Sequence, residues 1–444
     1  MSLTKNRFHQ SIFYFLISLL IIFNGFNNYD LFIQINFILI SLFFLICLKD
    51  LNYKAHIKKI SLDNRTTIFI YVLFLSYIIF QIVPFPIELL KILSFTKYKI
   101  LIELDQPKFF STISLDLSKT FFNFLNYFSL FLYFLIFKTI FYKEIHLLRF
   151  YLYILSAGFI SSLVGVYFFL IDNPDFLFIS NSSYASSATG FFINRTVFAC
   201  FLNLSFLAGI EYLSLIDYYS KKKKKFFYRK VYIRLFLLFI TIGIITSSSK
   251  IGNFLFFVMI LCYLFHFLFN KNKYLAYTLL VIILFDVFIL GFYFGGTKLL
   301  ERFYFLQDDL NSYSGFLNNF DSLSRADIVR FSLNQFFQFK FFGYGVGTYE
   351  VIFKIFNNNN SFFFANHAHS DIIEFLGELG IMGFSILCYL LIKILKKINL
   401  KTTKNIFLII YLITLLIFDF SFHIYLIQLI FILLISFNIK KIQN

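Results

Sequence analysis

Two histidines and three carboxylates stand at the start of one apolar run of the chain. The stretch "ANHAHSDIIEFLGELGIMGF" places His367, His369 and Asp371 within five positions of one another. Histidine suits proton transfer at neutral pH, because its ordinary pKa is about 6.5. Glu374 and Glu378 follow at helical spacing, on or close to the face that carries the aspartate. Ionisable groups at membrane depth are costly and usually face a cavity or a partner.

Cations occupy comparable positions at the starts of other apolar runs. Arg195 begins the run in "GFFINRTVFA", and Lys250 in "ITSSSKIGN" lies in a turn too short to carry it far from the next run. Arg325 and Arg330 precede "GYGVG", whose glycines indicate a turn or close backbone packing. Cations that converge with a histidine suit an anionic ligand, since guanidinium groups bind phosphate oxygens in pairs. We therefore expect one anion-binding pocket on one face.

Each of these side chains also has a purely structural interpretation. Arg195 could only extend to lipid headgroups, and Arg325 could form an ion pair with Asp321 or Asp327. Glu378, which stands among glycines, could serve packing alone. A zinc site made by the two histidines and the adjacent aspartate has no further ligand cluster nearby in sequence. No metal and no cofactor are therefore expected.

The composition indicates an integral membrane protein. The 444 residues are 59% hydrophobic and 14% charged, with a mean hydropathy of +0.78, whereas a soluble protein carries about 25% charged residues. The apolar residues form runs of about 18 to 24, long enough to cross a bilayer as helices. We predict an all-α polytopic membrane protein with about twelve transmembrane helices. They are expected near residues 11–26, 30–48, 66–84, 120–141, 148–171, 194–216, 232–247, 250–269, 274–295, 370–392, 405–421 and 423–439.

The net charge of +17 indicates an orientation rather than binding to nucleic acid. The stretch "SKKKKKFFYRK" is assigned to the cytoplasm, because short cytoplasmic loops are rich in lysine and arginine. Both termini then lie in the cytoplasm, together with the other basic connections at 49–65, 142–149, 271–273, 393–404 and 440–441. The opposite face receives residues 85–119, 172–193, 247–250 and 296–369.

The chain is predicted to form a single transmembrane domain over residues 1–444. One long periplasmic loop, 296–369, interrupts it, and the apolar spacing in "ADIVRFSLNQFF" predicts short helices there. Loops of this length without a function are uncommon in compact proteins. The four cysteines lie far apart within apolar runs, so neither a disulfide framework nor a CxxC metal site is expected.

The same motifs resemble the O-antigen ligase and O-antigen polymerase (Wzy-type) family. The core of that family has an arginine-started helix, a G-x-G-x-G turn, His-(Asn/Ser)-Asp and Glu-x-Gly in this order. The matching strings here are "SRADIVRFSLNQFFQFKFFGYGVGTYE" and "ANHAHSDIIEFLGELGIMGF". The string "GFFINRTVFACFL" resembles the family's Phe-x-Asn-Arg-Asn segment, with Thr196 in place of the second asparagine. "QIVPFPIELLKILS" and "ISLDLSKT" resemble its N-terminal half.

The resemblance implies transfer of a glycan from an undecaprenyl-diphosphate carrier to an acceptor hydroxyl at the periplasmic face of the bacterial inner membrane. The acceptor would be the lipid A core for a ligase, or another lipid-linked glycan for a polymerase. Such an enzyme would serve lipopolysaccharide and other cell-surface polysaccharide biosynthesis. Metal ions are not expected to take part in this transfer.

By motif, Arg195 and Arg325 would bind the diphosphate and His369 would activate the acceptor. Lys250 stands where the family often has arginine, so it keeps the charge but loses the bidentate geometry. Arg330 is a further candidate for the diphosphate. Supporting roles are expected for His367, Asp371 and Glu378.

Two other classes of function remain open from the sequence. A transporter or flippase commonly has twelve spans with both ends in the cytoplasm. Carriers, however, tend to place polar residues at mid-bilayer and to show two related halves, whereas the ionisable residues here gather on the outer side. A non-catalytic membrane scaffold would leave the aligned outer cations unexplained.

Overall fold

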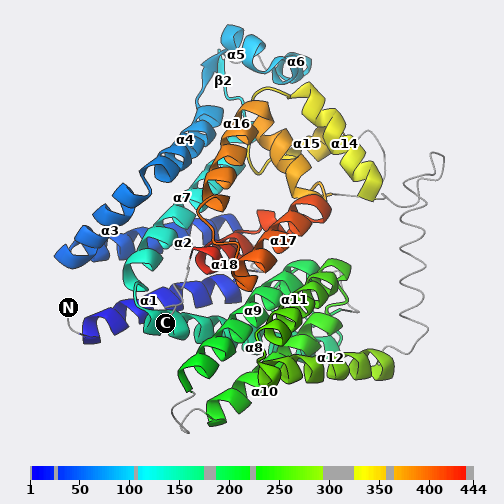
Figure 1. Cartoon of the computed structure of the whole chain (residues 1–444). Helices are drawn as coiled ribbons and strands as arrows, with labels where there is room; N and C mark the ends of the chain where they lie inside the picture. Colours follow the sequence, from blue (N-terminus) through cyan, green and yellow to red (C-terminus); the bar gives the residue numbers. More distant parts are fainter. Residues whose placement is uncertain are drawn as a thin grey trace.

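The computed structural model describes residues 3–24, 29–104, 109–174, 187–220, 227–293, 325–356 and 365–436, and most of them are helical (Figure 1). The two strands β1 and β2 form a short antiparallel pair, in which Phe85 lies opposite Ser111. The elements are α1 (Leu3–Ile22), α2 (Tyr29–Leu48), α3 (Leu51–Asp63), α4 (Arg65–Ile82), β1 (Phe85–Pro86), α5 (Ile87–Leu93), α6 (Phe95–Glu103), β2 (Phe110–Ser111), α7 (Leu117–Ile140), α8 (Glu144–Leu170), α9 (Arg195–Ser220), α10 (Phe227–Thr246), α11 (Lys250–Phe269), α12 (Lys273–Tyr293), α14 (Arg325–Gln338), α15 (Tyr349–Phe356), α16 (Asp371–Leu395), α17 (Thr403–Phe418), the 3-10 helix η2 (Ser421–His423) and α18 (Tyr425–Ile435).

The helices follow the apolar runs of the sequence. Each of the twelve predicted ranges is occupied by a helix, namely α1, α2, α4, α7–α12 and α16–α18. Seven helices among the described residues are long and apolar enough to cross a membrane: α2, α4, α7, α8, α9, α11 and α16. The predicted all-α polytopic membrane fold is therefore confirmed, whereas the number of twelve spans stays a prediction.

The two faces of α2 show how such a helix divides between lipid and protein. One face carries exposed apolar side chains at helical spacing, and the opposite face is buried and packs against α7. Exposed apolar side chains of this size belong in a hydrocarbon solvent rather than in water. The exposed residues include Leu31, Ile35, Ile38, Leu42 and Leu45, and the buried ones include Ile33, Ile40, Phe43 and Cys47.

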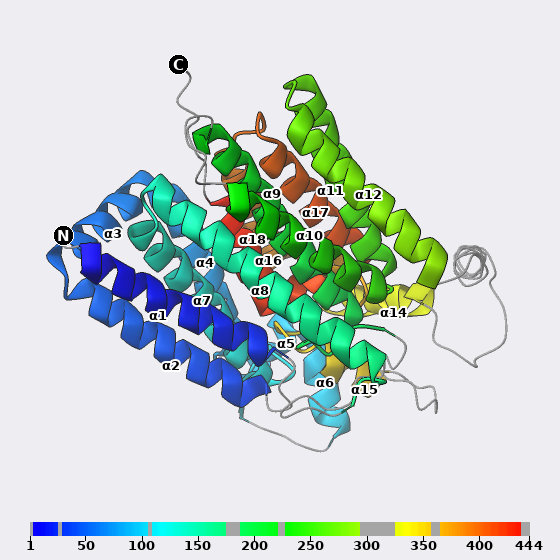
Figure 2. The ribbon, with the colours of Figure 1, turned by 90° about the horizontal axis from the view of Figure 1, so that it is seen from below.

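The C-terminal helices lie between two groups of earlier helices. In Figures 1 and 2, α16–α18 stand between α1, α2, α4 and α7 on one side and α9–α12 on the other. α16 packs against α4, α17 against α11, and α18 against both α7 and α9. Segments far apart in the sequence therefore meet at the centre of the bundle.

Small residues allow α8, α9 and α10 to approach closely. A Cβ atom on Gly158 of α8 would lie 2.3 Å from the Cβ atom of Ser205 on α9, and one on Gly243 of α10 would lie 2.4 Å from Ser162 Oγ. Helices in membranes depend on such close packing, because lipid provides no hydrophobic drive to associate. As a result α9 is buried along almost its whole described length.

The connecting segments lie at two ends of the bundle. At one end, the Ala188 amide donates to the Thr246 carbonyl (3.0 Å) and the Leu115 amide to the Tyr344 carbonyl (2.9 Å), which joins segments predicted to be periplasmic. At the other end, basic connections meet: Lys397 Nζ donates to Asn64 Oδ1 (3.0 Å). The predicted grouping of loops thus agrees with these contacts.

The long loop has a small core of its own. The sequence predicted helices here, and the structure has α14 over the expected "ADIVRFSLNQFF" as well as α15. Residues 294–324 and 357–364, which make up much of the predicted 296–369 loop, lie outside the described residues. The core is formed by buried side chains from α14, α15 and the segments that follow them: Ile328, Phe339, Tyr344, Tyr349, Ile352, Phe353, Ala365 and Ala368.

Candidate functional site

A turn of three glycines packs onto a break in α16. Gly343, Gly345 and Gly347 have φ values of 74°, 107° and 75°, which glycine adopts at little cost. A Cβ atom on Gly343 would lie 2.1 Å from the carbonyl oxygen of Glu378. The helix is interrupted beside this contact at Gly380, where φ is 62°. The spacing of "GYGVG" therefore serves a close approach of two backbones.

Gln81 of α4 connects the two halves of this junction. Its Nε2 donates to the carbonyls of Phe342 (2.8 Å) and Glu378 (2.9 Å), and its Oε1 accepts from the Val346 amide (3.3 Å). The helix break leaves backbone groups that need partners, and this buried amide provides them. The end of α4, the glycine turn and the N-terminal half of α16 are therefore held as one unit.

An ion pair holds α15 to the start of α7. Lys119 of α7 pairs with Glu350 of α15, and Lys354 lies 2.6 Å from the same carboxylate. Burial raises the pKa of Glu350, but the hydrogen bonds and charges of the two lysines outweigh it and hold the pKa below its ordinary value. This pair fixes the loop core to the bundle.

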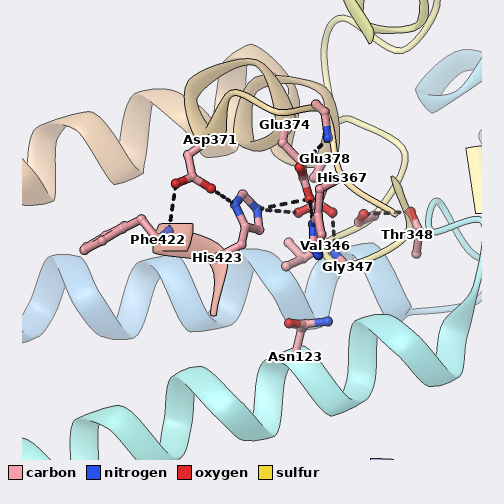
Figure 3. Close-up of polar contacts among 12 residues, drawn as sticks. Asn123, Val346, Gly347, Thr348, His367, Asp371, Glu374, Glu378, Phe422 and His423 are labelled. Carbon is pink, nitrogen blue, oxygen red and sulfur yellow. Dashed lines mark hydrogen bonds and ion pairs between the residues drawn. The ribbon is translucent and has the colours of Figure 1, made fainter. Parts of the chain in front are cut away.

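His423 lies at the centre of three buried carboxylates (Figure 3). Its Nδ1 donates to the Asp371 carboxylate. Its Nε2 lies 3.5 Å from Glu378 Oε2 and 3.8 Å from Glu374 Oε1. The ring of Phe375 stacks on the imidazole, with centroids 3.9 Å apart. The carboxylates come from successive turns of α16 and the histidine comes from η2, so this cluster joins the two elements.

Further hydrogen bonds hold the glutamates of the cluster. Glu374 accepts from His367 Nδ1 and from the Ala368 amide, both at 2.8 Å. Glu378 Oε1 accepts from the Gly347 amide at 2.8 Å, which links the cluster to the glycine turn. Glu374, Glu378 and His423 together could hold a metal ion, a group that the sequence did not predict.

His367 of this cluster favours the charged form. Burial lowers the pKa of His367, but the Glu374 carboxylate more than compensates and raises the pKa above its ordinary value. An imidazolium group at His367 would thus offset part of the charge of the three carboxylates.

His369 has an unusual backbone next to this cluster. Its φ is 56°, in the left-handed region that non-glycine residues rarely occupy, and such strain gathers at functional sites. The ring is half-buried and meets Phe420 edge-on, with centroids 5.4 Å apart. His367 stacks on the same phenyl ring at 4.4 Å. Because α16 begins two residues later, His369 lies next to the N-terminal end of that helix.

Two neighbouring helices each begin with a cation. Arg195 is the first residue of α9 and Lys250 the first of α11, and neither helix has an acidic residue in its first turn. A cation at a helix N-terminus is unfavourable by about 0.3–1 kcal/mol, since that end is already electropositive. Ser249 Oγ donates to Thr196 Oγ1 at 3.2 Å. The two helix starts are therefore adjacent and form one electropositive surface.

These helix starts lie at the same end of the bundle as His369. The Tyr411 hydroxyl of α17 donates to the Cys200 carbonyl at 3.3 Å, about 7.5 Å along α9 from Arg195. At the end of α17, the Asp419 carbonyl accepts from the Asp371 amide at 3.0 Å. The 3-10 helix η2 contacts α9, α16 and α17. Arg195 and the predicted base His369 thus belong to segments next to η2, whereas Lys250 begins α11, which packs against α9 and α17.

The other two predicted cations, Arg325 and Arg330, belong to α14. Arg325 is the first residue of α14, as the arginine-started helix of the motif predicted, and its side chain lies outside the described ones. Arg330 is exposed on the same helix. α14 packs against α16, so it borders the cluster from the side of the long loop.

Two residues of the site escaped the sequence analysis. His423 was the first residue of the predicted span 423–439, and its signal was the polar interruption "DFSFH" at the junction of two apolar runs. Gln81 is a lone amide near the end of an apolar run, and only its three-dimensional contacts reveal what it holds.

The comparison with known families bears on these same residues. Residues 235–388 match the family model described as O-antigen ligase. The resemblance to the O-antigen ligase and polymerase family is confirmed. The match includes the turn with Lys250, α14, the glycine turn and the N-terminal half of α16. It supports glycan transfer of the ligase or polymerase type on a lipid-linked substrate in a membrane. No curated protein matches the chain.

Proposed function

We propose that this protein transfers a glycan from undecaprenyl diphosphate to an acceptor hydroxyl at the periplasmic face of the bacterial inner membrane. The observation that carries the proposal is that η2 contacts both α16, which the strained His369 precedes, and α9, which begins with Arg195, within a chain that matches the O-antigen ligase family. The helix α11, which begins with Lys250, packs against α9 and α17. Both termini would lie in the cytoplasm, because the basic connections group at the opposite end.

The donor diphosphate is proposed to bind at the starts of α9 and α11. Arg195 and Lys250 bring positive charge to a surface where two helix N-termini already favour an anion. The lipid chain would lie along the bundle, with the glycan in the periplasm. Arg325 and Arg330 of α14 are proposed to reach the diphosphate or the first sugars from the side of the long loop.

The acceptor is proposed to be activated by His369. The imidazole takes the proton of the acceptor hydroxyl, and the oxygen attacks the anomeric carbon of the donor sugar. The bond from that carbon to the diphosphate breaks, and undecaprenyl diphosphate leaves with the electron pair. Because Arg195 and Lys250 meet the growing charge, neither an acid carboxyl nor a metal is needed at the reacting atoms. A single displacement of this kind inverts the anomeric configuration.

His367, Asp371 and Glu378 are proposed to support this base rather than to touch the substrate. All three belong to the hydrogen-bonded network that fixes the start of α16 and η2. Phe420 lies between the two histidines and sets the position of the His369 ring.

The test is an assay of the purified protein with a lipid-diphosphate glycan and an acceptor. His369→Ala should lose turnover and keep donor binding, whereas Arg195→Ala should weaken donor binding. His56→Ala, on the exposed surface of α3 at the opposite end, is the matched control. Movement of the lipid-linked glycan across vesicles without transfer, unchanged in His369→Ala, would instead identify a transporter or flippase.

The choice between ligase and polymerase depends on the acceptor. A strain that lacks a ligase should accumulate full-length glycan on its carrier lipid. Loss of a polymerase should instead leave single repeats on the final acceptor. The glycan profile of a deletion strain therefore distinguishes the lipid A core from a second lipid-linked glycan as acceptor.

A further inference from the structure

The atoms between α16 and η2 are spaced like the ligands of one ion. Glu374, Glu378 and His423 each present a ligand atom, and these atoms lie within 4.8 Å of one another. The separations of 3.5 Å and 3.8 Å from His423 Nε2 to the two carboxylates exceed the roughly 2.7–3.2 Å of a hydrogen bond. Two ligand atoms each about 2.1 Å from a tetrahedral ion lie about 3.4 Å apart.

Two of these atoms are buried without a hydrogen bond. Glu378 Oε2 and His423 Nε2 are shielded from solvent and have no hydrogen-bond partner among the described residues. Glu378 is 0% exposed, and its other oxygen is already occupied by the Gly347 amide. Buried polar atoms rarely lack a partner, so both atoms face a position that a cation would fill.

The surrounding groups orient the ligands as they do in metal sites. Asp371 accepts from His423 Nδ1, which turns the lone pair of Nε2 toward the glutamates. The Phe422 amide in turn donates to Asp371 at 3.0 Å, and the Ala368 amide holds Glu374. A carboxylate behind a ligating histidine is a common feature of metal sites, because it fixes the tautomer and the ring.

We propose that Glu374, Glu378 and His423 bind one divalent transition-metal cation of the zinc class. One imidazole nitrogen with two carboxylate oxygens suits zinc, whereas magnesium and calcium prefer oxygen ligands alone. The ion ties α16 to η2 behind His369 and takes no part in making or breaking bonds to the glycan. The proposal does not depend on the transferase activity, since it concerns only these buried side chains.

Zinc binding by the tag-free full-length protein tests the proposal. The protein is stripped with a chelator in detergent and then titrated with zinc ions by calorimetry. We expect one ion per chain, and excess magnesium should not compete. Glu378→Gln keeps an acceptor for the Gly347 amide and should weaken zinc binding at least about tenfold. Asp371→Asn, which alters only the group behind the histidine, should weaken it about 10- to 100-fold. Glu350→Gln should bind zinc as the wild type does.

The proposal is overturned if the stripped wild-type protein binds no zinc, or if Glu378→Gln binds it equally well. In that case protons on the histidines of the cluster, rather than a metal ion, offset the carboxylate charge. If the variants fail to fold, X-ray absorption of the zinc-loaded wild type decides. Nitrogen and oxygen neighbours at about 2.0–2.2 Å support the site, whereas a sulfur shell assigns the metal to a cysteine and overturns it. Glycan transfer assays are separate, so either proposal can fail without the other.

Discussion

The backbone of His369 has a left-handed conformation, which lowers the stability of the folded protein. A left-handed residue other than glycine costs about 1–2 kcal/mol, and asparagine bears this conformation better than histidine. We predict that His369→Asn lowers turnover at least about 100-fold, the contribution of a general base. The same change should leave the melting temperature unchanged or raise the stability by up to about 1 kcal/mol. Activity assays and thermal unfolding of the purified protein measure both effects.

His56→Asn is the control for this substitution. His56 is exposed on α3, in a helical conformation, so the change should affect neither turnover nor stability appreciably. A large loss of stability in His369→Asn would show that the histidine ring holds the fold together, and would weaken its assignment as the base.

The ion pair of Glu350 makes part of the protein's stability depend on pH. Because its pKa in the folded protein lies below the ordinary value of about 4.5, its ion pair stabilises the fold above that value. The contribution is lost as the pH falls through the lowered folded value. Glu350→Gln should therefore melt at a lower temperature than the wild type near neutral pH, and the two should converge at pH values below the lowered pKa of Glu350. Parallel melting curves across this range would contradict the prediction.

At the scale of elements, Ser249 joins the starts of two helices. Its Oγ accepts from the Gly252 amide as the N-cap of α11 and donates to Thr196 of α9. Ser249→Ala should destabilise the protein by about 1 kcal/mol. Since the two helix starts would separate, it should raise the KM for the lipid-diphosphate donor and leave kcat nearly unchanged. Steady-state kinetics at saturating acceptor measure this.

Asp50→Ala is the matched control, because Asp50 caps α3 in the same way at the opposite end of the bundle. It should cost a similar amount of stability with no change in KM. Equal effects of the two variants on KM would mean that donor binding does not depend on the joint between α9 and α11.

The sequence predicts elements well where one physical signal dominates. Apolar length alone predicts α2 and α11, because a helix is the way a single segment satisfies its backbone in lipid. It does not predict η2, which lies where one predicted span ends and the next begins and which contacts α9, α16 and α17. The motif predicted the helix α14, whereas the role of His369 stays a prediction. The cluster of His423 could not be predicted, because its partners are about fifty residues away in the chain.

The candidate site and the basic connections lie at opposite ends of the molecule, and chemical labelling can test which end faces the periplasm. Lys250 is exposed at the end with the candidate site, and Lys397 is exposed among the basic connections. In intact spheroplasts without contaminating inverted vesicles, a membrane-impermeant maleimide should label Lys250→Cys and not Lys397→Cys. Permeabilised cells should label both, with the wild type as background for the four native cysteines. The opposite pattern would remove the periplasmic assignment and with it the proposed reaction.

The two cation-started helices have a consequence for the protein when it is empty. Arg195 and Lys250 add positive charge to helix N-termini that are already electropositive. Under the proposed mode of donor binding, a bound diphosphate stabilises the folded protein, because it binds the native form. We therefore expect anionic carrier lipid added to the detergent micelle to prolong the lifetime of the protein during purification.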